Sequence, residues 1–412
     1  MEILKQALSK IKSIGKNKYN FLILLVQGFI GIMGKRNYRN LSRYIGLDEH
    51  TISRQMTKDV DFAAVNIEMI ASSRQENCMY LWAQDASFIP KSGEQTAGLD
   101  YHWNGSAGKA EMGLEVDAIA VIKIDDDKKE GFAVSAKLSP ANPVPYKERK
   151  KKEKDDPTKI DAALDHLTAV TPKLLSLGLE YGAVDAFYAK EKYVNGAVKL
   201  GWHVISKLRK DARLFKPYTG PQKARGRKRL YANERISRSD FTDIIATTDE
   251  NGEPIELSSC VAYSPSMKRM IKVVLVKKVT DKTCGEALLF STDLKQNTLQ
   301  IYKFYTSRFQ IEFVFRDAKG FTGLTDCQSR DERRINYHLN VSLLALNVAK
   351  LEDGALQKKA GTKYAFSMAN WARKFHVEFV INRFISMFGF DLTFIKLNPL
   401  YETMLSFGTI LH

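Results

Sequence analysis

The segment Tyr305–Lys319, YTSRFQIEFVFRDAK, places one acidic side chain among several basic ones. On a helix that turns about 100° per residue, five side chains would share one face within roughly 80°: Tyr305, Arg308, Glu312, Arg316 and Lys319. A carboxylate surrounded by positive charges and hydrogen-bond donors suits phosphate chemistry. A surface helix with ion pairs would also mix the two charges, so this segment alone leaves both interpretations open.

Two aspartates end or interrupt apolar runs that are typical of buried strands. Asp85 closes the apolar stretch in LWAQDAS, and Asp185 lies within GAVDAFY. A carboxylate in a buried strand is costly unless it is paired, hydrogen-bonded or bound to a metal ion. A capping or turn position would explain either aspartate equally well. Asp117 in LEVDAIA and Asp293 in STDL look similar, and spacing alone does not exclude them.

The two aspartates would face a common point at the centre of a sheet if their strands lie side by side. Glu312 could then approach this point from a helix on the same face. Three carboxylates from separate elements can bind two Mg²⁺ ions about 3.5–4 Å apart, which activate the attacking oxygen and stabilise the leaving oxygen in a phosphoryl displacement. We therefore predict that Asp85, Asp185 and Glu312 are catalytic metal ligands for two Mg²⁺ ions, with Mn²⁺ as a substitute. The rest of the helical face, Tyr305, Arg308, Arg316 and Lys319, is predicted to bind DNA phosphates.

The elements that must position these acids read as a mixed αβ sheet. Runs rich in β-branched and aromatic residues predict an antiparallel meander of three strands, at 79–89, 114–124 and 130–139. The pattern then predicts a helix at 159–177, a strand at 181–189, a helix at 190–200 and a strand at 202–208. A charge run at 147–156, KERKKKEKDD, is interpreted as a solvated loop.

The first 70 residues are expected to be helical, and LSRYIGLDEHTISRQM has the pattern of a helix-turn-helix. Gly46 would supply the turn between a helix that contains Leu41 and Ile45 and a helix anchored by Leu47, Ile52 and Met56. The outer face would then carry His50, Thr51, Arg54 and Gln55. Side chains of these types reach base edges and phosphates in a major groove. A plain helical hairpin in a bundle is the alternative.

A strongly basic segment opens the region 207–286. Between Lys207 and Arg229 there are ten basic residues and one acid, Asp211. Its Gly-Pro and Arg-Gly-Arg elements favour an extended loop, and short strand-like runs follow. Basic residues interleaved with Phe215 and Tyr231 suit a surface that tracks a nucleic-acid strand. The predicted DNA contacts here are Lys210, Arg213, Lys223, Arg225, Arg227, Lys228 and Arg229. A merely solvated loop is the alternative.

The composition favours a polyanionic partner and argues against a membrane. The chain has 412 residues and a formal net charge of +16, and neutralising phosphates with Lys or Arg releases counterions. Nucleic acid is the leading partner. The apolar stretch Phe21–Met33 is too short to span a bilayer and is interpreted as a buried helix. The four cysteines show no zinc or disulfide spacing, which favours a reducing cytosol.

The order Tyr305, two residues, Arg308, three residues, Glu312, six residues, Lys319 resembles the Tyr-Arg-Glu-Lys signature of bacterial cut-and-paste insertion-sequence transposases. The two aspartates match the first two acids of their Asp-Asp-Glu triad. The resemblance implies Mg²⁺-dependent cleavage at transposon ends and transfer of the freed 3′-hydroxyl to target DNA. It also implies a homodimer on double-stranded DNA, with terminal inverted repeats and target DNA as partners, in the cytoplasm at the nucleoid.

The resemblance extends over most of the chain and implies a ribonuclease-H-like α/β fold. The expected parts are a helical DNA-binding domain at 1–70, a catalytic core at 71–206 and 287–350, a basic β-rich insertion at 207–286, and a helical region at 351–412 that could serve self-association. Helices near 336–350 and across 364–388 are expected at the C-terminal end.

The chain departs from the family pattern in its insertion. Some members pass through a DNA hairpin and hold a flipped base against an aromatic residue of the insertion, commonly Trp. The tryptophans here are Trp82, Trp103, Trp202 and Trp371, none of them in the insertion, so Phe215, Tyr218 or Tyr231 would have to substitute. Two other functions stay open: a catalytically silent DNA-binding repressor, and a structure-selective nuclease on the same fold.

Overall fold

The structure, a computed structural model, describes residues 1–93, 95–125, 128–142, 158–279, 284–362 and 364–409. The charge run at 147–156, predicted to be a solvated loop, lies outside the described residues. Within the described ranges, no helix is long and apolar enough to cross a membrane. Most of the apolar stretch predicted to be a buried helix lies in α2, Lys16–Gly31, which ends two residues before the exposed Met33.

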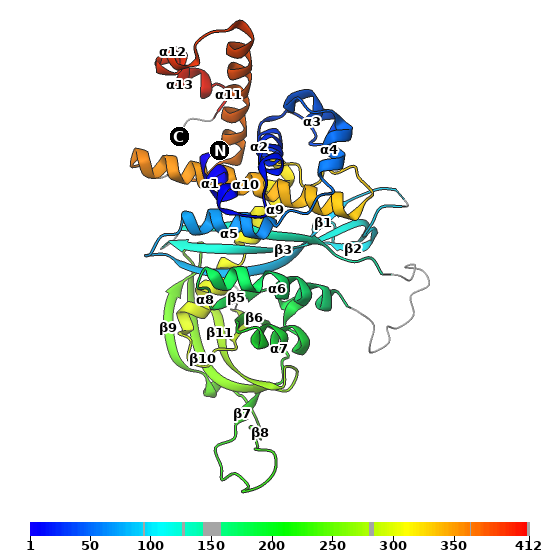
Figure 1. Cartoon of the computed structure of the whole chain (residues 1–412). Coiled ribbons are helices and arrows are strands. Elements are labelled where there is room, and N and C mark those ends of the chain that lie inside the picture. Colours follow the sequence, from blue (N-terminus) through cyan, green and yellow to red (C-terminus); the bar gives the residue numbers. More distant parts are fainter. Residues whose placement is uncertain (94, 126–127, 143–157, 280–283, 363, 410–412) are drawn as a thin grey trace.

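In the described part of the chain, twelve strands form one mixed sheet (Figure 1). The strands are β1 (Met79–Pro90), β2 (Asp100–Asn104), β3 (Lys109–Asp125), β4 (Lys128–Leu138), β5 (Tyr181–Val184), β6 (His203–Leu208), β7 (Phe215–Pro217), β8 (Tyr231–Arg235), β9 (Thr242–Thr248), β10 (Pro254–Ser264), β11 (Arg269–Val279) and β12 (Cys284–Ser291). Their order is β2-β3-β1-β5-β6-β12-β11-β10-β7-β8, with β4 paired to β3 and β9 paired to β10. This mixed α/β sheet is consistent with the predicted ribonuclease-H-like class.

The centre of the sheet has the pairing that the site prediction requires. Strands β1, β3 and β4 form the predicted antiparallel meander. Strand β1 then pairs in parallel with β5, and β5 pairs in parallel with β6. Parallel neighbours need a crossover connection, to which helix α6 (Lys159–Ser176) contributes between β4 and β5. The strand that contains Asp85 and the strand that ends just before Asp185 therefore lie side by side.

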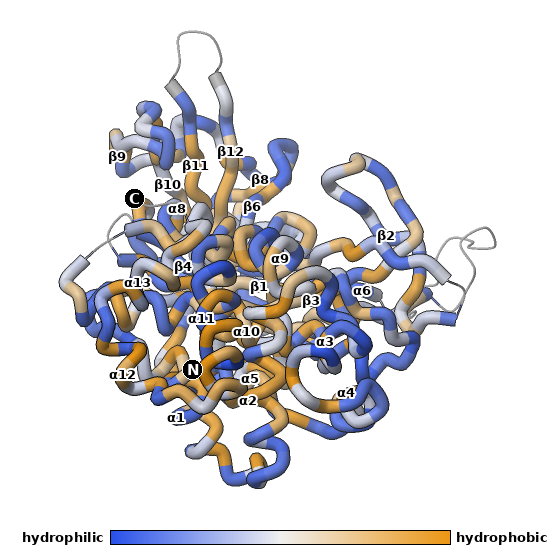
Figure 2. Tube along the Cα trace, turned by 90° about the horizontal axis from the view of Figure 1, so that it is seen from above, coloured by the Kyte–Doolittle hydropathy of each residue, from blue (hydrophilic) through white to orange (hydrophobic). Residues whose placement is uncertain are grey.

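Helices cover both faces of this sheet. They are α1 (Glu2–Lys10), α2, α3 (Tyr38–Ile45), α4 (Glu49–Gln55), α5 (Phe62–Ser72), α6, α7 (Glu191–Lys199), α8 (Thr298–Ser307), α9 (Gln310–Phe321), α10 (Glu332–Ala360), α11 (Met368–Phe388), α12 (Leu392–Leu397) and α13 (Leu400–Leu405). Helix α9 packs on one face of the sheet, α6 and α7 lie on the other, and α5 and α10 lie along the outer edge of β4 (Figure 1). Hydrophobic residues run along α2, α5 and α10, where a core forms beside this edge (Figure 2).

The predicted helix-turn-helix pattern forms two short helices, α3 and α4. Gly46 ends α3 with φ of 70°, a left-handed conformation that glycine adopts without steric cost. The Asp48 side chain caps α4 by accepting a hydrogen bond from the backbone N–H of Thr51. Four of the five predicted anchors are buried, Leu41, Ile45, Ile52 and Met56. Leu47 precedes α4 and is only partly buried. The two helices and the turn at Gly46 lie where the pattern predicts them, and a helix-turn-helix that contacts DNA through α4 stays a prediction.

The predicted β-rich insertion extends the same sheet. Strand β12 pairs antiparallel with β6, and β11 and β10 follow in order. Strands β7 and β8 form a hairpin that projects from the body of the protein (Figure 1). Residues 218–230, between these strands, contain no helix, as the Gly-Pro and Arg-Gly-Arg elements predict. The basic residues are thus presented on an arm of the central sheet.

Helix α10 covers the outer edge of β4 with asparagine side chains. Asn340 accepts from the Ala136 N–H at 2.9 Å and donates to the Ala136 carbonyl at 2.8 Å. Asn347 makes the same pair of bonds with Ala133, and Asn336 accepts from the N–H of Leu138. An amide side chain offers a donor and an acceptor, as a neighbouring strand would. The helix therefore satisfies an edge that would otherwise expose unpaired backbone groups.

We expect Asn340→Ala to lower the free energy of unfolding by about 2–4 kcal/mol, because the N–H and carbonyl of Ala136 lose their partners in a buried position. Asn336→Ala, which removes only the acceptor for Leu138, should cost about half as much. Urea unfolding of both variants measures the difference. Equal losses would contradict the paired role of Asn340.

A buried histidine ties α10 to the turn after α9. His338 is fully buried, and its Nε2 donates to the carbonyl of Gly323 at 2.7 Å. Its ring lies 5.0 Å from the ring of Phe29 on α2. Burial lowers the pKa of His338 to about 4, although the bond to Gly323 raises it in part. The folded protein therefore keeps this histidine neutral.

We expect His338 to make the protein less stable in acid. Its folded-state pKa of about 4 lies below the ordinary value of 6.5, so unfolding takes up a proton and stability falls as the pH decreases from 6.5 to 4. The loss should reach about 3 kcal/mol. His338→Gln keeps a donor for Gly323 without titrating, so its stability should fall less over this range in thermal unfolding. Parallel curves for the two proteins would refute the assignment.

Candidate active site

The first two predicted acids follow paired residues of neighbouring strands. Gln84 of β1 lies opposite Val184 of β5, and Asp85 and Asp185 are the next residues along the chain. Asp185 was predicted to lie within a strand, and this was wrong: β5 ends at Val184. Asp185 instead begins a short 3₁₀ helix, Ala186–Tyr188, in which the Tyr188 N–H donates to the Asp185 carbonyl at 3.0 Å.

Glu312 reaches the same point from helix α9, but not on the continuous helix that the sequence predicts. The segment divides into α8 and α9, with Arg308 and Phe309 between them. Here the N–H groups of Ile311 and Glu312 bond three residues back, to the carbonyls of Arg308 and Phe309, which tightens the turn. Glu312 lies in the first turn of α9, and Arg308 lies at the junction.

The guanidinium of Arg308 joins all three predicted acids. Its Nη1 lies 2.9 Å from Oδ2 of Asp85, and its Nη2 lies 3.5 Å from Oε1 of Glu312 and 3.9 Å from Oδ1 of Asp185. The Arg308 side chain is 11% exposed, and its Nε is buried without a hydrogen-bond partner among the described residues. Acids separated by more than 200 residues in the chain therefore meet around one positive charge.

Burial makes two of these carboxylates harder to ionise, and one arginine does not offset this cost fully. It raises the pKa of Asp85 to about 6, although the Arg308 guanidinium acts in the opposite direction. Burial also raises the pKa of Glu312. Carboxylates that are costly to ionise at a shared point are stabilised by a nearby cation. The arrangement therefore favours occupation by positive charge.

The three carboxylates are suitable ligands for a hard divalent cation, but they would have to move closer together to bind one. Carboxylate oxygens are the ligands that Mg²⁺ and Mn²⁺ prefer. Among the residues that the structure describes, no three Asp, Glu, His or Cys side chains stand close enough together to hold a metal ion as placed. The Arg308 guanidinium lies among the three carboxylates instead. The carboxylates have the chemistry that binds Mg²⁺, but as placed they surround the Arg308 guanidinium.

The other members of the predicted phosphate-binding face take different positions. Lys319 donates from Nζ to the carbonyl of Phe88 at 2.8 Å, which ties α9 to β1 three residues beyond the first acid. Tyr305 is half-buried beside Arg308, whose guanidinium lies 5.9 Å from its ring centre. Arg316 pairs with Asp317 at 2.9 Å. Of this group, Arg308 and Glu312 meet the two aspartates.

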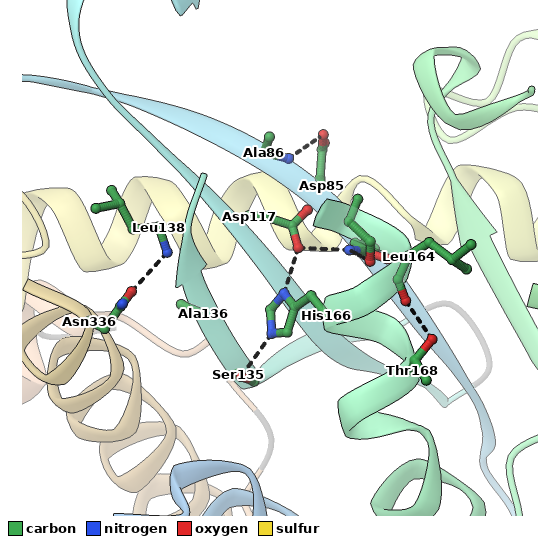
Figure 3. Close-up of polar contacts among 12 residues, drawn as sticks. Asp85, Ala86, Asp117, Ser135, Ala136, Leu138, Leu164, His166, Thr168 and Asn336 are labelled. Carbon is green, nitrogen blue, oxygen red and sulfur yellow. Dashed lines mark hydrogen bonds and ion pairs between the residues drawn. The ribbon is translucent and has the colours of Figure 1, made fainter. Parts of the chain in front are cut away.

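The two look-alike aspartates lie elsewhere. Asp293 accepts a hydrogen bond from the Tyr181 hydroxyl at 2.7 Å. Asp117 is buried, and it accepts a bond of 2.6 Å from His166 and another of 2.7 Å from Gln84 (Figure 3). The sequence analysis missed this network. A glutamine in the apolar strand directly before Asp85 and a histidine on the apolar face of a helix were the available signals.

The predicted DNA-contacting residues of α4 lie on the surface. His50 and Arg54 are exposed, whereas Thr51 and Gln55 are partly buried. A hollow of about 520 Å³ is lined by Asp48, His50, Thr51, Ser53, Arg54, Thr57 and Arg334. Arg334 comes from α10 and donates to the Ser53 carbonyl at 3.1 Å. The structure thus places a second arginine, missed in the sequence, beside α4.

The basic arm presents its charges to solvent. Four exposed side chains between β7 and β8 have no ion-pair or hydrogen-bond partner among the described residues: Lys223, Arg225, Arg227 and Lys228. Lys210 and Arg213 are exposed before β7. The Arg229 guanidinium lies 4.6 Å from the ring centre of Tyr218. Tyr231 stacks on Tyr263 at 4.3 Å and contacts Phe215, so these aromatic rings pack against each other at the base of the arm.

Comparisons with known families match the chain across the site. The model described as DDE superfamily endonuclease matches residues 36–251, more than half of the chain. The model described as transposase DDE domain matches residues 156–348. A comparison with curated proteins found no match.

We expect Arg308→Met to lower the free energy of unfolding of the metal-free protein by about 2–4 kcal/mol, because Asp85 then keeps a buried charge without its partner. Adding Asp85→Asn should recover part of this loss, since the uncompensated charge is removed. Unfolding in EDTA at pH 8 is measured for Arg308→Met, for Asp85→Asn and for the double variant. Strictly additive losses would show that the two residues are not coupled.

Proposed function

The chain belongs to the DDE superfamily endonucleases, and on this basis we propose that it is a DNA transposase whose Asp85, Asp185 and Glu312 bind divalent metal ions. It would cleave transposon ends by hydrolysis and join the freed 3′-hydroxyl to target DNA. Mg²⁺ is the proposed ion, with two ions per site and Mn²⁺ as a substitute. A nuclease of this family is the broader activity that the matches establish.

The observation that carries the proposal is the meeting of three acids around one guanidinium. The first family match contains both aspartates, and the second contains Asp185 and Glu312. All three carboxylates lie between 2.9 and 3.9 Å from nitrogens of the one Arg308 guanidinium. The convergence supports a single catalytic site over three unrelated structural acids.

Two bound Mg²⁺ ions would supply activation of the attacking oxygen and stabilisation of the leaving oxygen. The chain's own residues would prepare this site. Asp85 and Asp185 approach from the sheet, and Glu312 approaches from α9. Arg308 would move its guanidinium from the carboxylates to a DNA phosphate, which offers the same bidentate geometry. Lys319 would hold α9 against β1 during this exchange.

The distribution of charge supports double-stranded DNA as the partner. The chain carries a net charge of +16, and the arm presents four cations without protein partners in the described residues. The exposed side chains of α4 would contact the terminal inverted repeats, and the arm would track the backbone. A homodimer on paired ends and a nucleoid location belong to the same proposal.

The DNA products would reveal which of two cleavage routes the protein uses. A hairpin route would leave covalently closed ends, and direct hydrolysis would leave open ends. If a base is flipped, Tyr218 is the aromatic residue of the arm that does not join the stack of Phe215, Tyr231 and Tyr263. Denaturing gels of cleaved ends distinguish the two routes.

We expect Asp85→Asn, Asp185→Asn and Glu312→Gln each to reduce cleavage by about three orders of magnitude, since loss of a metal ligand removes several kcal/mol of transition-state stabilisation. Binding to the ends should persist in gel shifts. Asp293→Asn is the matched control, because Asp293 also follows a strand of the sheet but pairs with Tyr181 away from the acids. Its cleavage should stay near the wild-type rate.

Three results would contradict the proposal. Cleavage by Asp85→Asn at the wild-type rate would remove that residue from the site. End binding without cleavage by the wild-type protein in Mg²⁺ or Mn²⁺ would favour the silent repressor. Equal cleavage of end sequences and random junctions would favour the structure-selective nuclease.

A further inference from the structure

A buried polar network lies beneath the candidate site, on the opposite face of β1. Its centre is Asp117 on β3, which accepts hydrogen bonds from three elements, and Figure 3 shows the one from His166. Oδ2 accepts from Nε2 of Gln84 at 2.7 Å and from Nδ1 of His166 at 2.6 Å. Oδ1 accepts from the hydroxyl of Tyr188 at 3.2 Å. A carboxylate buried in a core needs such donors, and Asp117 has three.

Gln84 connects this network to the first acid. Its side chain is fully buried, and both of its N–H groups are used, one toward Asp117 and the other toward the Ala163 carbonyl at 2.9 Å. Its Oε1 accepts from the Tyr193 hydroxyl at 2.5 Å. Successive side chains on a strand point to opposite faces, so Gln84 holds β1 from below at the point where Asp85 projects above.

Tyr188 connects the same network to the second acid. It is the last residue of the 3₁₀ helix that Asp185 begins, and its N–H closes that turn on the Asp185 carbonyl. The Tyr188 side chain is 2% exposed, and its hydroxyl reaches Asp117. One buried carboxylate is therefore bonded to the residue before Asp85 and to the residue that closes the turn at Asp185.

His166 connects the network to a fourth element. With Nδ1 donating to Asp117, Nε2 lies 2.9 Å from the Ser135 hydroxyl on β4 and accepts from it. The order Ser135, His166, Asp117 is that of a nucleophilic triad. His166 is only 4% exposed, however, and Asp117 also serves two other donors, so the arrangement does not present a nucleophile to a substrate. The geometry favours a role in holding elements together.

We propose that Asp117 and His166 are positioning residues that set the spacing of Asp85 and Asp185, and thereby the affinity of the site for a divalent cation. A fully satisfied buried network has one favoured arrangement, because any shift leaves a buried polar group unpaired. The network spans β1, β3, β4, α6 and the turn after β5, which together fix the two aspartates. This inference rests on the proposed metal site.

The test is calorimetric titration of Mn²⁺ into the metal-free full-length protein, which needs no catalysis. Tyr188→Phe removes one hydroxyl from the network and should weaken Mn²⁺ binding by about tenfold, the loss typical of residues that orient metal ligands. Tyr181→Phe is the matched control. It removes a tyrosine hydroxyl from β5 itself, one bonded to Asp293. Its affinity should stay within about twofold of wild type.

A second pair of variants tests the histidine. His166→Asn keeps an N–H near the position of Nδ1, so it should retain most of the affinity for Mn²⁺. His166→Leu removes the donor and should weaken binding by about ten- to a hundredfold. Leucine fills the space of the histidine but offers no hydrogen bond. Higher Mn²⁺ affinity in His166→Asn than in His166→Leu would therefore show that the hydrogen bond to Asp117, and not the filled volume, supports the site.

The outcomes are distinct. The proposal is supported if Tyr188→Phe binds Mn²⁺ weakly, Tyr181→Phe binds it with wild-type affinity, and the two variants unfold at similar temperatures. Unchanged affinity in Tyr188→Phe and His166→Leu overturns it and leaves the proposed metal site intact. Wild-type protein that binds no more Mn²⁺ than Asp85→Asn overturns the metal site and the positioning role together.

Discussion

Three carboxylates that meet at one point repel each other, and the rest of the structure is arranged around that constraint. Arg308 offsets part of the repulsion, with nitrogens 2.9 to 3.9 Å from all three acids. Burial still raises the pKa of Asp85 to about 6, so one arginine does not balance the group fully. A group of acids held together against this cost needs rigid supports, and it gains most from an additional cation.

Those supports come from both faces of the sheet. Above it, Lys319 ties α9 to the Phe88 carbonyl and keeps Glu312 near β1. Below it, Asp117 is bonded to Gln84 and Tyr188, next to the two aspartates. The two faces differ in kind: the upper one concentrates charge where a cation and phosphates would bind, and the lower one is a closed network in which every donor has a partner. Such a division lets the upper face change its ligands while the backbone stays in place.

The same sheet also connects the site to the surfaces proposed for DNA. Strand β12 joins the basic arm to β6, two strands from Asp85, without a break in hydrogen bonding. At the opposite edge, asparagines of α10 replace a missing strand beside β4, and Arg334 of that helix contacts α4. The N-terminal helices, the central sheet and the arm are therefore one continuous framework, in which an edge is closed by side-chain amides because exposed backbone groups would be costly.

The sequence by itself determined the elements and the identity of the candidate acids. Periodicity located the meander and the helix-turn-helix pattern, and the spacing of Arg308 and Glu312 marked the site, because these signals depend on residues close together in the chain. Only the tertiary structure decided that Asp117 and Asp293 lie apart from the acids, that the helix divides at Arg308, and that Gln84, His166 and Tyr188 form a support. These outcomes depend on strand pairing between distant segments and on which buried donors find partners. Local sequence patterns predict neither of these.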